Sequence, residues 1–220
     1  MRGWEGLRSW RGDASVGWAA RLPDVVAVGP YNDPSPYGYS VYFGTDDNRL
    51  YRVVLSVDQQ GSWVTQVAPG WPYQCDGVPV GTPALGMAGN EPAVYVSNTS
   101  GLIHCIHAST GSRIWRSAQL GAITPPLYAP SPFGATNGSR VYVGNSGWQI
   151  LAFETSYSGS PENQPPVWYV WASGPLLRTP SAGYGPLPLE ESRWRIYVYA
   201  ATGLSTLDKI VDKGASGEVA

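Results

Sequence analysis

The sequence predicts an all-β fold built from four copies of one unit of short antiparallel strands. Three observations lead to this prediction: the abundance of glycine and proline, the shortage of charged residues, and a pattern that recurs about every 50 residues. The 220 residues include 27 Gly and 20 Pro, and 14% are charged, against about 25% in an average protein. The longest stretch without Gly or Pro runs only from Thr45 to Gln60, which leaves little room for helices.

Each copy begins with a first strand and continues with a strand that contains a tyrosine. A Thr-Pro pair marks the first strand in three copies, and residues 23–28 take its place in the remaining copy. β-Branched and aromatic residues dominate the tyrosine strand, as in most strands. The Thr-Pro pairs are Thr82-Pro83, Thr124-Pro125 and Thr179-Pro180, and the tyrosines, which are 53, 47 and 55 residues apart, are Tyr42, Tyr95, Tyr142 and Tyr197.

A turn and a third strand follow each tyrosine strand. We expect a left-handed backbone at the turn, because its residue is glycine in three copies and asparagine in the other, and these residues adopt that conformation most easily. The third strand has apolar residues at its first and fourth positions. The turn residues are Asn48, Gly101, Gly147 and Gly203, and the third strands begin at Leu50, Ile103, Ile150 and Leu204.

A tryptophan after one more turn marks the outer strand of each copy except the last. Trp63, Trp115 and Trp168 open these strands. Four short strands in a unit of about 50 residues are typical of one blade of a β-propeller. We therefore expect a β-propeller with about four blades of four antiparallel strands.

The best copy, the segment 94–115 with the sequence VYVSNTSGLIHCIHASTGSRIW, resembles the repeat of the pyrroloquinoline-quinone-like (PQQ-like) β-propeller family. The resemblance covers residues 18–220. In that family the tryptophan usually docks against the neighbouring blade, so the resemblance implies inter-blade contacts for Trp18, Trp63, Trp115 and Trp168. The expected domains are an N-terminal extension at 1–16 and a propeller at 17–220, with blades at roughly 17–63, 64–115, 116–168 and 169–220.

The spacing of the tryptophans leads to an expectation about ring closure. Because the fourth copy has no tryptophan, we expect its blade to have three strands and to lack the outer one. Residues 17–22 would then pair with the strand at 204–208 and close the ring, hiding two sheet edges. The competing interpretation is that the chain is part of a larger propeller of six to eight blades.

The resemblance also raises the question of a quinone cofactor. Quinoprotein dehydrogenases of this family hold the quinone between a tryptophan and, in many members, two adjacent cysteines, beside a calcium ion and an aspartate base. This chain has no adjacent cysteines, so we expect no cofactor. Cys105 takes the position of Ala152 in the repeat, which indicates a small buried thiol, and a disulfide with Cys75 is the alternative.

The two histidines, His104 and His107, flank Cys105 but do not predict a metal site. Side chains alternate along a strand, so His104 is expected to face away from Cys105 and His107, which leaves at most two ligands together. The sequence contains no Gly-x-Ser-x-Gly motif and no glycine-rich phosphate loop. We therefore assign no catalytic residue, no metal ligand and no cofactor-binding residue.

Charge and hydropathy narrow the classes of partner. The net charge is −2 and there is no run of lysine or arginine, so neither nucleic acid nor an anionic membrane surface is an expected partner. There is no apolar run near 18 residues for membrane insertion and no visible signal peptide, and the localisation stays open.

Long loops rich in Pro, Gly, Ser and Tyr are the expected binding regions. We therefore predict a noncatalytic interaction or scaffold module whose partner is another protein. The alternative is a quinoprotein-dehydrogenase-like or carbohydrate-active propeller enzyme, or a fragment of one. Large aromatic side chains dominate protein interfaces, and the candidate partner-binding residues are Tyr37, Tyr39, Trp71, Tyr73 and Trp194.

Overall fold

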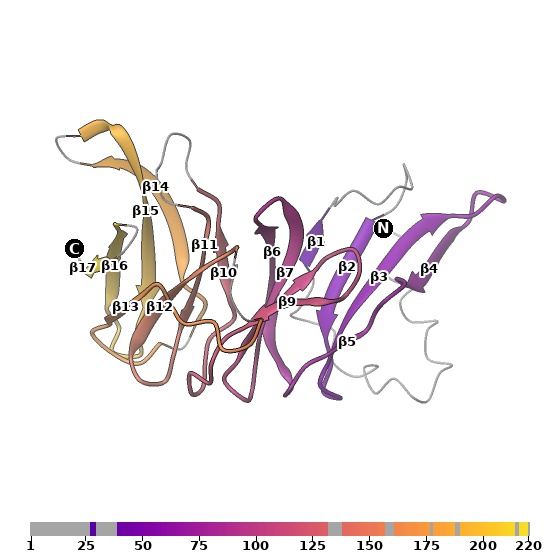
Figure 1. Ribbon diagram of the computed structural model, residues 1–220, viewed down its shortest axis with the longest axis horizontal. Coiled ribbons are helices and arrows are strands. Elements are labelled where there is room, and N and C mark those ends of the chain that lie inside the picture. Colours follow the sequence, from indigo (N-terminus) through magenta and orange to yellow (C-terminus); the bar gives the residue numbers. More distant parts are fainter. Residues whose placement is uncertain are drawn as a thin grey trace.

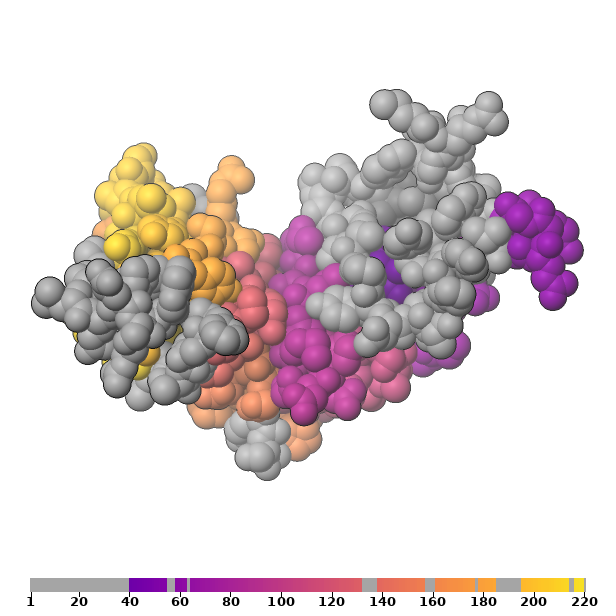
Figure 2. Space-filling model, turned by 90° about the horizontal axis from the view of Figure 1, so that it is seen from above, coloured from indigo at the N-terminus to yellow at the C-terminus, as the bar shows by residue number. Residues whose placement is uncertain are grey.

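The computed structural model contains four antiparallel sheets that stand side by side in chain order (Figure 1). We call these sheets blades 1 to 4. The first and fourth blades lie at opposite ends of the row, and the view from above shows them at opposite ends of a bent molecule (Figure 2). The predicted all-β fold of four antiparallel blades is confirmed, and the described residues contain no helix. The structure describes residues 27–29, 39–131, 138–156, 161–176, 178–187, 190–213 and 216–219.

Consecutive strands are neighbours within every blade, and the tyrosine strand is always the second of the four. Blade 1 contains β1 (Ala27–Gly29), β2 (Tyr39–Gly44), β3 (Arg49–Val57) and β4 (Trp63–Val67), and β5 (Tyr73–Gln74) pairs with the start of β3. Blade 2 contains β6 (Pro79–Ala88), β7 (Glu91–Asn98), β8 (Ile103–His107) and β9 (Arg113–Arg116). Blade 3 contains β10 (Leu127–Ala129), β11 (Arg140–Gly144), β12 (Gln149–Glu154) and β13 (Trp168–Trp171). Blade 4 contains β14 (Ser181–Leu187), β15 (Glu190–Ala201), β16 (Leu207–Asp212) and β17 (Gly217–Val219).

Blade 4 has an outer strand, contrary to the sequence prediction. β17 pairs with β16, with Gly217 opposite Asp212. A Cβ on Gly217 would lie 2.7 Å from the ring of Trp168, so glycine allows this strand to lie against the preceding blade. The prediction of a three-stranded blade was wrong because it took tryptophan as the only mark of an outer strand. Of the expected closing pair, residues 17–22 lie outside the described residues and residues 204–206 lie in the turn before β16.

The turn between the second and third strands has the same geometry in all four blades. The N–H at the end of the second strand donates to the carbonyl four residues later, at 2.9 to 3.0 Å. The donors are Thr45, Asn145 and Thr202, each directly after its strand, and Asn98, the last residue of β7. One residue in each turn has a left-handed backbone. These residues are Asn48, Gly101, Trp148 and Ser205, with φ of 65°, 77°, 62° and 62°.

This geometry confirms Asn48 and Gly101 as the left-handed residues but corrects the alignment of the later copies. The predicted Gly147 and Gly203 precede the left-handed residues of blades 3 and 4. In the first three blades the repeat tyrosine lies three positions before the residue that opens the turn, and in blade 4 that position holds Tyr199, not Tyr197. The third strand of blade 4 begins at Leu207, three residues later than predicted. The equivalents of Leu207 in the other blades are Leu50, Ile103 and Ile150, each the first or second residue of its strand.

The apolar core lies between neighbouring blades. Leu50 of blade 1 packs in one cluster with Val94 and Ile106 of blade 2. Cys105 of blade 2 packs in the next cluster with Phe153 of blade 3, so the predicted buried thiol is confirmed. A third cluster joins blades 3 and 4 in the same way. Since a single sheet cannot bury its own faces, each blade depends on its neighbour for a core.

Tyrosine and tryptophan side chains carry a hydrogen bond across each of these interfaces. Tyr42 donates to the carbonyl of Ala108 at 3.1 Å, and Trp115 Nε1 donates to the carbonyl of Thr155 at 3.2 Å. Each acceptor is the residue directly after the third strand of the following blade. The equivalent residue of blade 4, Asp212, accepts through its carboxylate instead.

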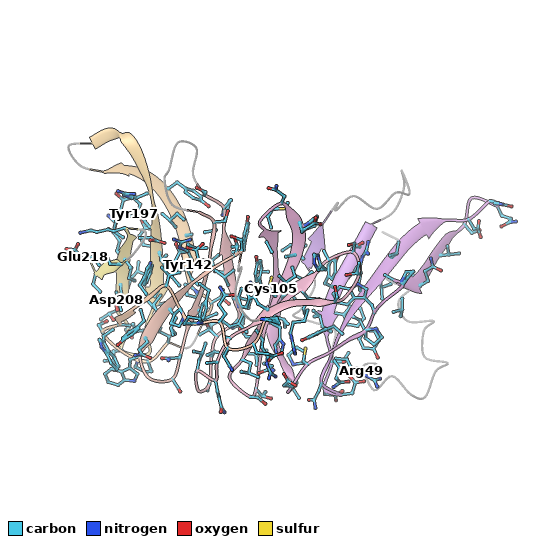
Figure 3. All side chains as sticks on the ribbon, viewed as in Figure 1. Arg49, Cys105, Tyr142, Tyr197, Asp208 and Glu218 are labelled. Atoms are coloured by element: carbon cyan, nitrogen blue, oxygen red, sulfur yellow. The ribbon has the colours of Figure 1, made fainter. Side chains whose placement is uncertain are left out.

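Asp212 is fully buried and is held by three side chains of blade 3. Its two oxygens accept from Tyr142 Oη at 2.5 Å and from Trp168 Nε1 at 3.2 Å, and Arg140 Nε lies 3.8 Å away. Figure 3 labels Tyr142 beside the blade 4 strands. Burial, reinforced by the Asp212 charge, raises the pKa of Tyr142, which keeps its hydroxyl protonated and able to donate.

The expected inter-blade tryptophan contacts are confirmed for Trp115 and Trp168. Each packs beside the tyrosine of its own blade, with ring centroids 5.9 Å and 5.8 Å apart. At the interface of blades 1 and 2 the ring in this place is Trp71, 5.5 Å from Tyr42. Trp18 and the side chain of Trp63 lie outside the described part of the chain.

We predict that Tyr142→Phe lowers the free energy of unfolding by about 2 kcal/mol, because it leaves a buried carboxylate without its shortest hydrogen bond. Urea denaturation measures this change. The control is Tyr199→Phe at the equivalent position of blade 4, the last blade in the described row, which is expected to change the same quantity by less than about 0.5 kcal/mol. Equal losses in the two variants would contradict the role given to Asp212.

Candidate interaction site

Four exposed apolar side chains lie at one end of blades 3 and 4. Their exposed fractions, 45% to 64%, are high for side chains of this size. Three come from blade 3 and one from the turn between the second and third strands of blade 4. We call this set the blade 3–4 patch, and its members are Trp148, Tyr169, Trp171 and Leu204.

Backbone contacts bring the three aromatic residues of the patch together. Trp148 is the left-handed residue of the β11–β12 turn, and its carbonyl accepts from Ala172 N at 2.7 Å, directly after β13. Trp171 pairs with Gln149, the neighbour of Trp148. The rings of Tyr169 and Trp171 meet edge to face, with centroids 6.3 Å apart and planes at 87°.

Alternation along β13 explains why these rings are exposed. Trp168 is buried against blade 4 and Val170 is partly buried in the same cluster. The side chains between and after them, Tyr169 and Trp171, must point to the opposite side of the sheet, away from blade 4. They are 53% and 64% exposed.

The segment that follows β13 places Leu204 of blade 4 at the same end of the molecule. Ser173 donates to the buried Asp208 carboxylate from its backbone N at 2.6 Å and from its hydroxyl at 2.8 Å. A Cβ on Gly174 would lie 2.9 Å from Leu204 Cγ, so Leu204 lies directly over this segment. Figure 3 labels Asp208 at the end of the molecule where blades 3 and 4 meet.

Leu207 is also exposed, at 68%, but it lies outside the patch. Asp208 and Ile210, which follow it on β16, are buried toward blade 3, so alternation points Leu207 away from blade 3. Its equivalents Leu50, Ile103 and Ile150 are fully buried against the following blade.

A second cluster surrounds His104, which is fully buried between blades 1 and 2. Its Nδ1 lies 2.9 Å from Tyr73 Oη and its Nε2 lies 3.0 Å from Asn98 Nδ2. Because Asn98 Oδ1 accepts from Leu102 N, the Asn98 amide must donate to Nε2, which places the imidazole proton on Nδ1. Burial lowers the pKa of His104 to about 4 although Asp76 lies 3.9 Å away, so the ring is neutral near pH 7.

Charged side chains continue this cluster toward the surface. Arg116 pairs with Asp76 at 2.5 Å and with Glu162, and Arg113 also pairs with Glu162. All four side chains are 29% to 45% exposed, so solvent screens these pairs and each contributes little to stability. They nevertheless join three blades, because Asp76 follows blade 1, the arginines lie on β9 and Glu162 precedes β13.

The described residues contain no cluster of metal-binding side chains, and both cysteines are buried. No group of three or more His, Cys, Asp or Glu side chains in this part of the chain could hold a metal ion. Cys75 and Cys105 are free, buried thiols rather than a disulfide. Burial raises the pKa of Cys75 to about 12 and raises that of Cys105 as well, which disfavours the thiolate a nucleophile needs.

The partner-binding residues predicted from the sequence do not lie in one place in the structure. Trp71 and Tyr73 are 7% and 9% exposed and belong to the core between blades 1 and 2, so they are not the surface side chains that were expected. Tyr39 lies in β2 and Trp194 in β15, opposite Pro186, and their side chains lie outside the description. Tyr37 lies outside the described residues.

The sequence analysis missed Trp148, Tyr169 and Trp171. Two of them follow directly after a tryptophan already assigned to the interface, in the sequence Trp168-Tyr169-Val170-Trp171. Alternation along that strand is the signal that could have found them, because residues one and three positions after an inward tryptophan must face outward.

Solved β-propeller structures are similar to this chain in fold. BBS1N in complex with ARL6DN, soaked with mercury, has a TM-score of 0.56 at 18% identity over 88% of this chain and 52% of that one. The same complex soaked with lead has a TM-score of 0.55 at 18% identity over 88% and 48%. BamB from Moraxella catarrhalis has a TM-score of 0.48 at 18% identity over 89% and 49%.

The likeness to the two BBS1N structures establishes the β-propeller fold, and the chain spans about half the length of those proteins. No protein-family model matches the chain, and no curated protein matches it in sequence. Among the described residues, no helix is long and apolar enough to cross a membrane.

The neutral, buried His104 predicts a pH-dependent stability. Its pKa falls from 6.5 when unfolded to about 4 when folded, so the unfolded state binds the proton first as the pH decreases. The stabilisation is fully present above pH 6.5 and is lost between about pH 6.5 and 4, by about 3 kcal/mol. Urea denaturation at pH 7.0 and 4.5 should show a smaller loss for His104→Gln than for the wild type. His107→Gln is the control and should retain the wild-type loss.

Proposed function

We propose that this chain is a noncatalytic β-propeller module that binds another protein through the blade 3–4 patch. The observation that carries this proposal is the exposure of Trp148, Tyr169 and Trp171 together at one end of blade 3. Tryptophan and tyrosine are the residues most enriched at the energetic centres of protein interfaces. They bring large apolar surfaces at a low cost in side-chain entropy.

The rigidity of the frame supports the same proposal. The left-handed turn fixes the backbone of Trp148, and the bonds from Ser173 to Asp208 fix the segment beside Leu204. A patch held in this way loses little conformational freedom when it binds. We also retain Tyr37, Tyr39 and Trp194 as proposed partner-binding residues.

The similar propeller BBS1N was crystallised in complex with another protein, ARL6DN. That likeness shows a common fold and no common site, since the identity is 18%. It agrees with a propeller used as a protein-binding module. The patch on the present chain supplies the independent physical reason.

Photo-crosslinking tests the proposal. We expect a benzoylphenylalanine placed at Trp148 or Leu204 to crosslink a protein in extracts of the source cells. A benzoylphenylalanine at Val64, an exposed apolar residue of blade 1, is the control and should give no specific product. Changing Trp171 to Ser in the Leu204 variant should lower the yield at least about tenfold, because it removes a large interface side chain. Equal products at Val64 and at the patch would contradict the proposal.

An activity assay tests the enzyme alternative. We expect the purified protein, supplied with pyrroloquinoline quinone and calcium, not to oxidise alcohols or sugars, because the chain lacks adjacent cysteines. Dye-linked turnover above that of the quinone alone would overturn this expectation.

A further inference from the structure

The outer edge of blade 3 has hydrogen-bonding groups without a partner strand. β13 pairs with β12 and with no other strand that the structure describes. Ala172 N donates to Trp148 O, so the backbone groups of Ala172 point toward β12. Those of Val170 and Trp168, two and four residues earlier, point the same way. The backbone N–H and C=O groups of Tyr169 and Trp171 therefore point outward from the sheet.

The corresponding edge of blade 2 is covered by the chain itself. Pro161 O accepts from Arg116 N and Gln164 N donates to Arg116 O, both at 2.9 Å, and Ser117 and Gln164 form a parallel bridge. Glu162 of this covering segment pairs with the arginines of β9. An outer edge of this propeller can thus accept an extended segment, and here ion pairs accompany the backbone hydrogen bonds.

β13 is a short strand that follows Pro165 and Pro166, but the strand itself carries no residue that blocks pairing. Its residues, Trp168 to Trp171, include no charge, no proline and no glycine, and its outward groups lie beside two exposed aromatic rings. Natural proteins usually place lysine, proline or a bulge at such an edge to prevent pairing with another chain. Within the strand, the outward groups are therefore free of side chains that would prevent pairing.

We propose that β13 pairs antiparallel with β13 of a second copy of this chain, about a twofold axis at Val170. This inference rests on the proposed function and names the partner that the patch binds. With the axis at Val170, Tyr169 of one copy lies opposite Trp171 of the other. Both are outward-facing positions, so each N–H meets a C=O and no outward group is left unpaired.

Side-chain chemistry supports this register. Residues opposite each other in an antiparallel pair share one face, so Tyr169 of each copy lies beside Trp171 of the other. The four rings would form one aromatic layer on the side facing away from blade 4. Because the strand carries no charge, the two copies meet without like-charge repulsion. A one-residue slip would place inward-facing groups opposite outward ones and lose the hydrogen bonds.

Sedimentation velocity tests the association. We expect the wild-type chain to form a species of twice the 23.6 kDa chain mass at tens of micromolar. Trp171→Pro removes the aromatic ring and an outward N–H but no hydrogen bond within blade 3. Trp171→Thr removes the ring and keeps the N–H. The proline variant should therefore weaken the dimer at least about tenfold more than the threonine variant. A wild-type monomer at about 100 μM, or equal effects of the two variants, would overturn the inference.

Oxidative crosslinking tests the register without depending on a proline variant. Val170 is opposite itself in a non-hydrogen-bonded pair, where Cα atoms lie about 4.5 Å apart, within the range a disulfide spans. Val170→Cys should therefore form a disulfide-linked dimer, and Tyr169→Cys, whose equivalents lie farther apart, should not. Crosslinking at Tyr169→Cys alone would overturn the register. A monomeric chain that still crosslinks a different protein at Trp148 or Leu204 would refute this inference and leave the proposed function intact.

Discussion

The structure depends on the contact by which the tyrosine and tryptophan of one blade reach the end of the third strand in the next. Their rings fill the space between two sheets, and their polar atoms bond to Ala108, Thr155 or Asp212. A wrong stacking of blades would bury these donors without acceptors, at about 1–3 kcal/mol each. The contact therefore supplies both the core and the direction in which the blades are stacked.

The three interfaces meet this requirement with different chemistry. The first two use main-chain carbonyls, whereas the third uses the carboxylate of Asp212 with two donors and a nearby arginine, Arg140. A buried carboxylate is tolerated only when hydrogen bonds and an opposite charge replace its water. Blades 3 and 4 are consequently joined by a charged contact, and the blade 3–4 patch lies on this joined pair.

The repeat was predictable from the sequence in the copies that keep its characteristic residues at a constant spacing. It was not predictable in the copy that lacks them. Tyr42, Tyr95 and Tyr142 were identified correctly because a turn of constant length follows each of them. Blade 4 was misaligned because Gly203 and Leu204 resemble the turn glycine and the first apolar residue of the third strand two and three residues too early. A hydrogen bond from Thr202 to Thr206, which no sequence pattern reveals, defines the true turn. Trp71 was misjudged for a related reason, since it reaches the core from a loop outside the repeat.

The outer strands explain how a repeat fold of this kind can acquire a binding surface without losing stability. Trp115 and Trp168 keep the inward position on β9 and β13, while other positions of these two strands differ in chemistry. On β9, Arg113 and Arg116 pair with Glu162, which belongs to the segment that covers this edge. On β13, Tyr169 and Trp171 are exposed, and no described segment covers the edge beside them. The same strand of the repeat therefore has a covered, charged edge on blade 2 and, among the described residues, an uncovered aromatic edge on blade 3.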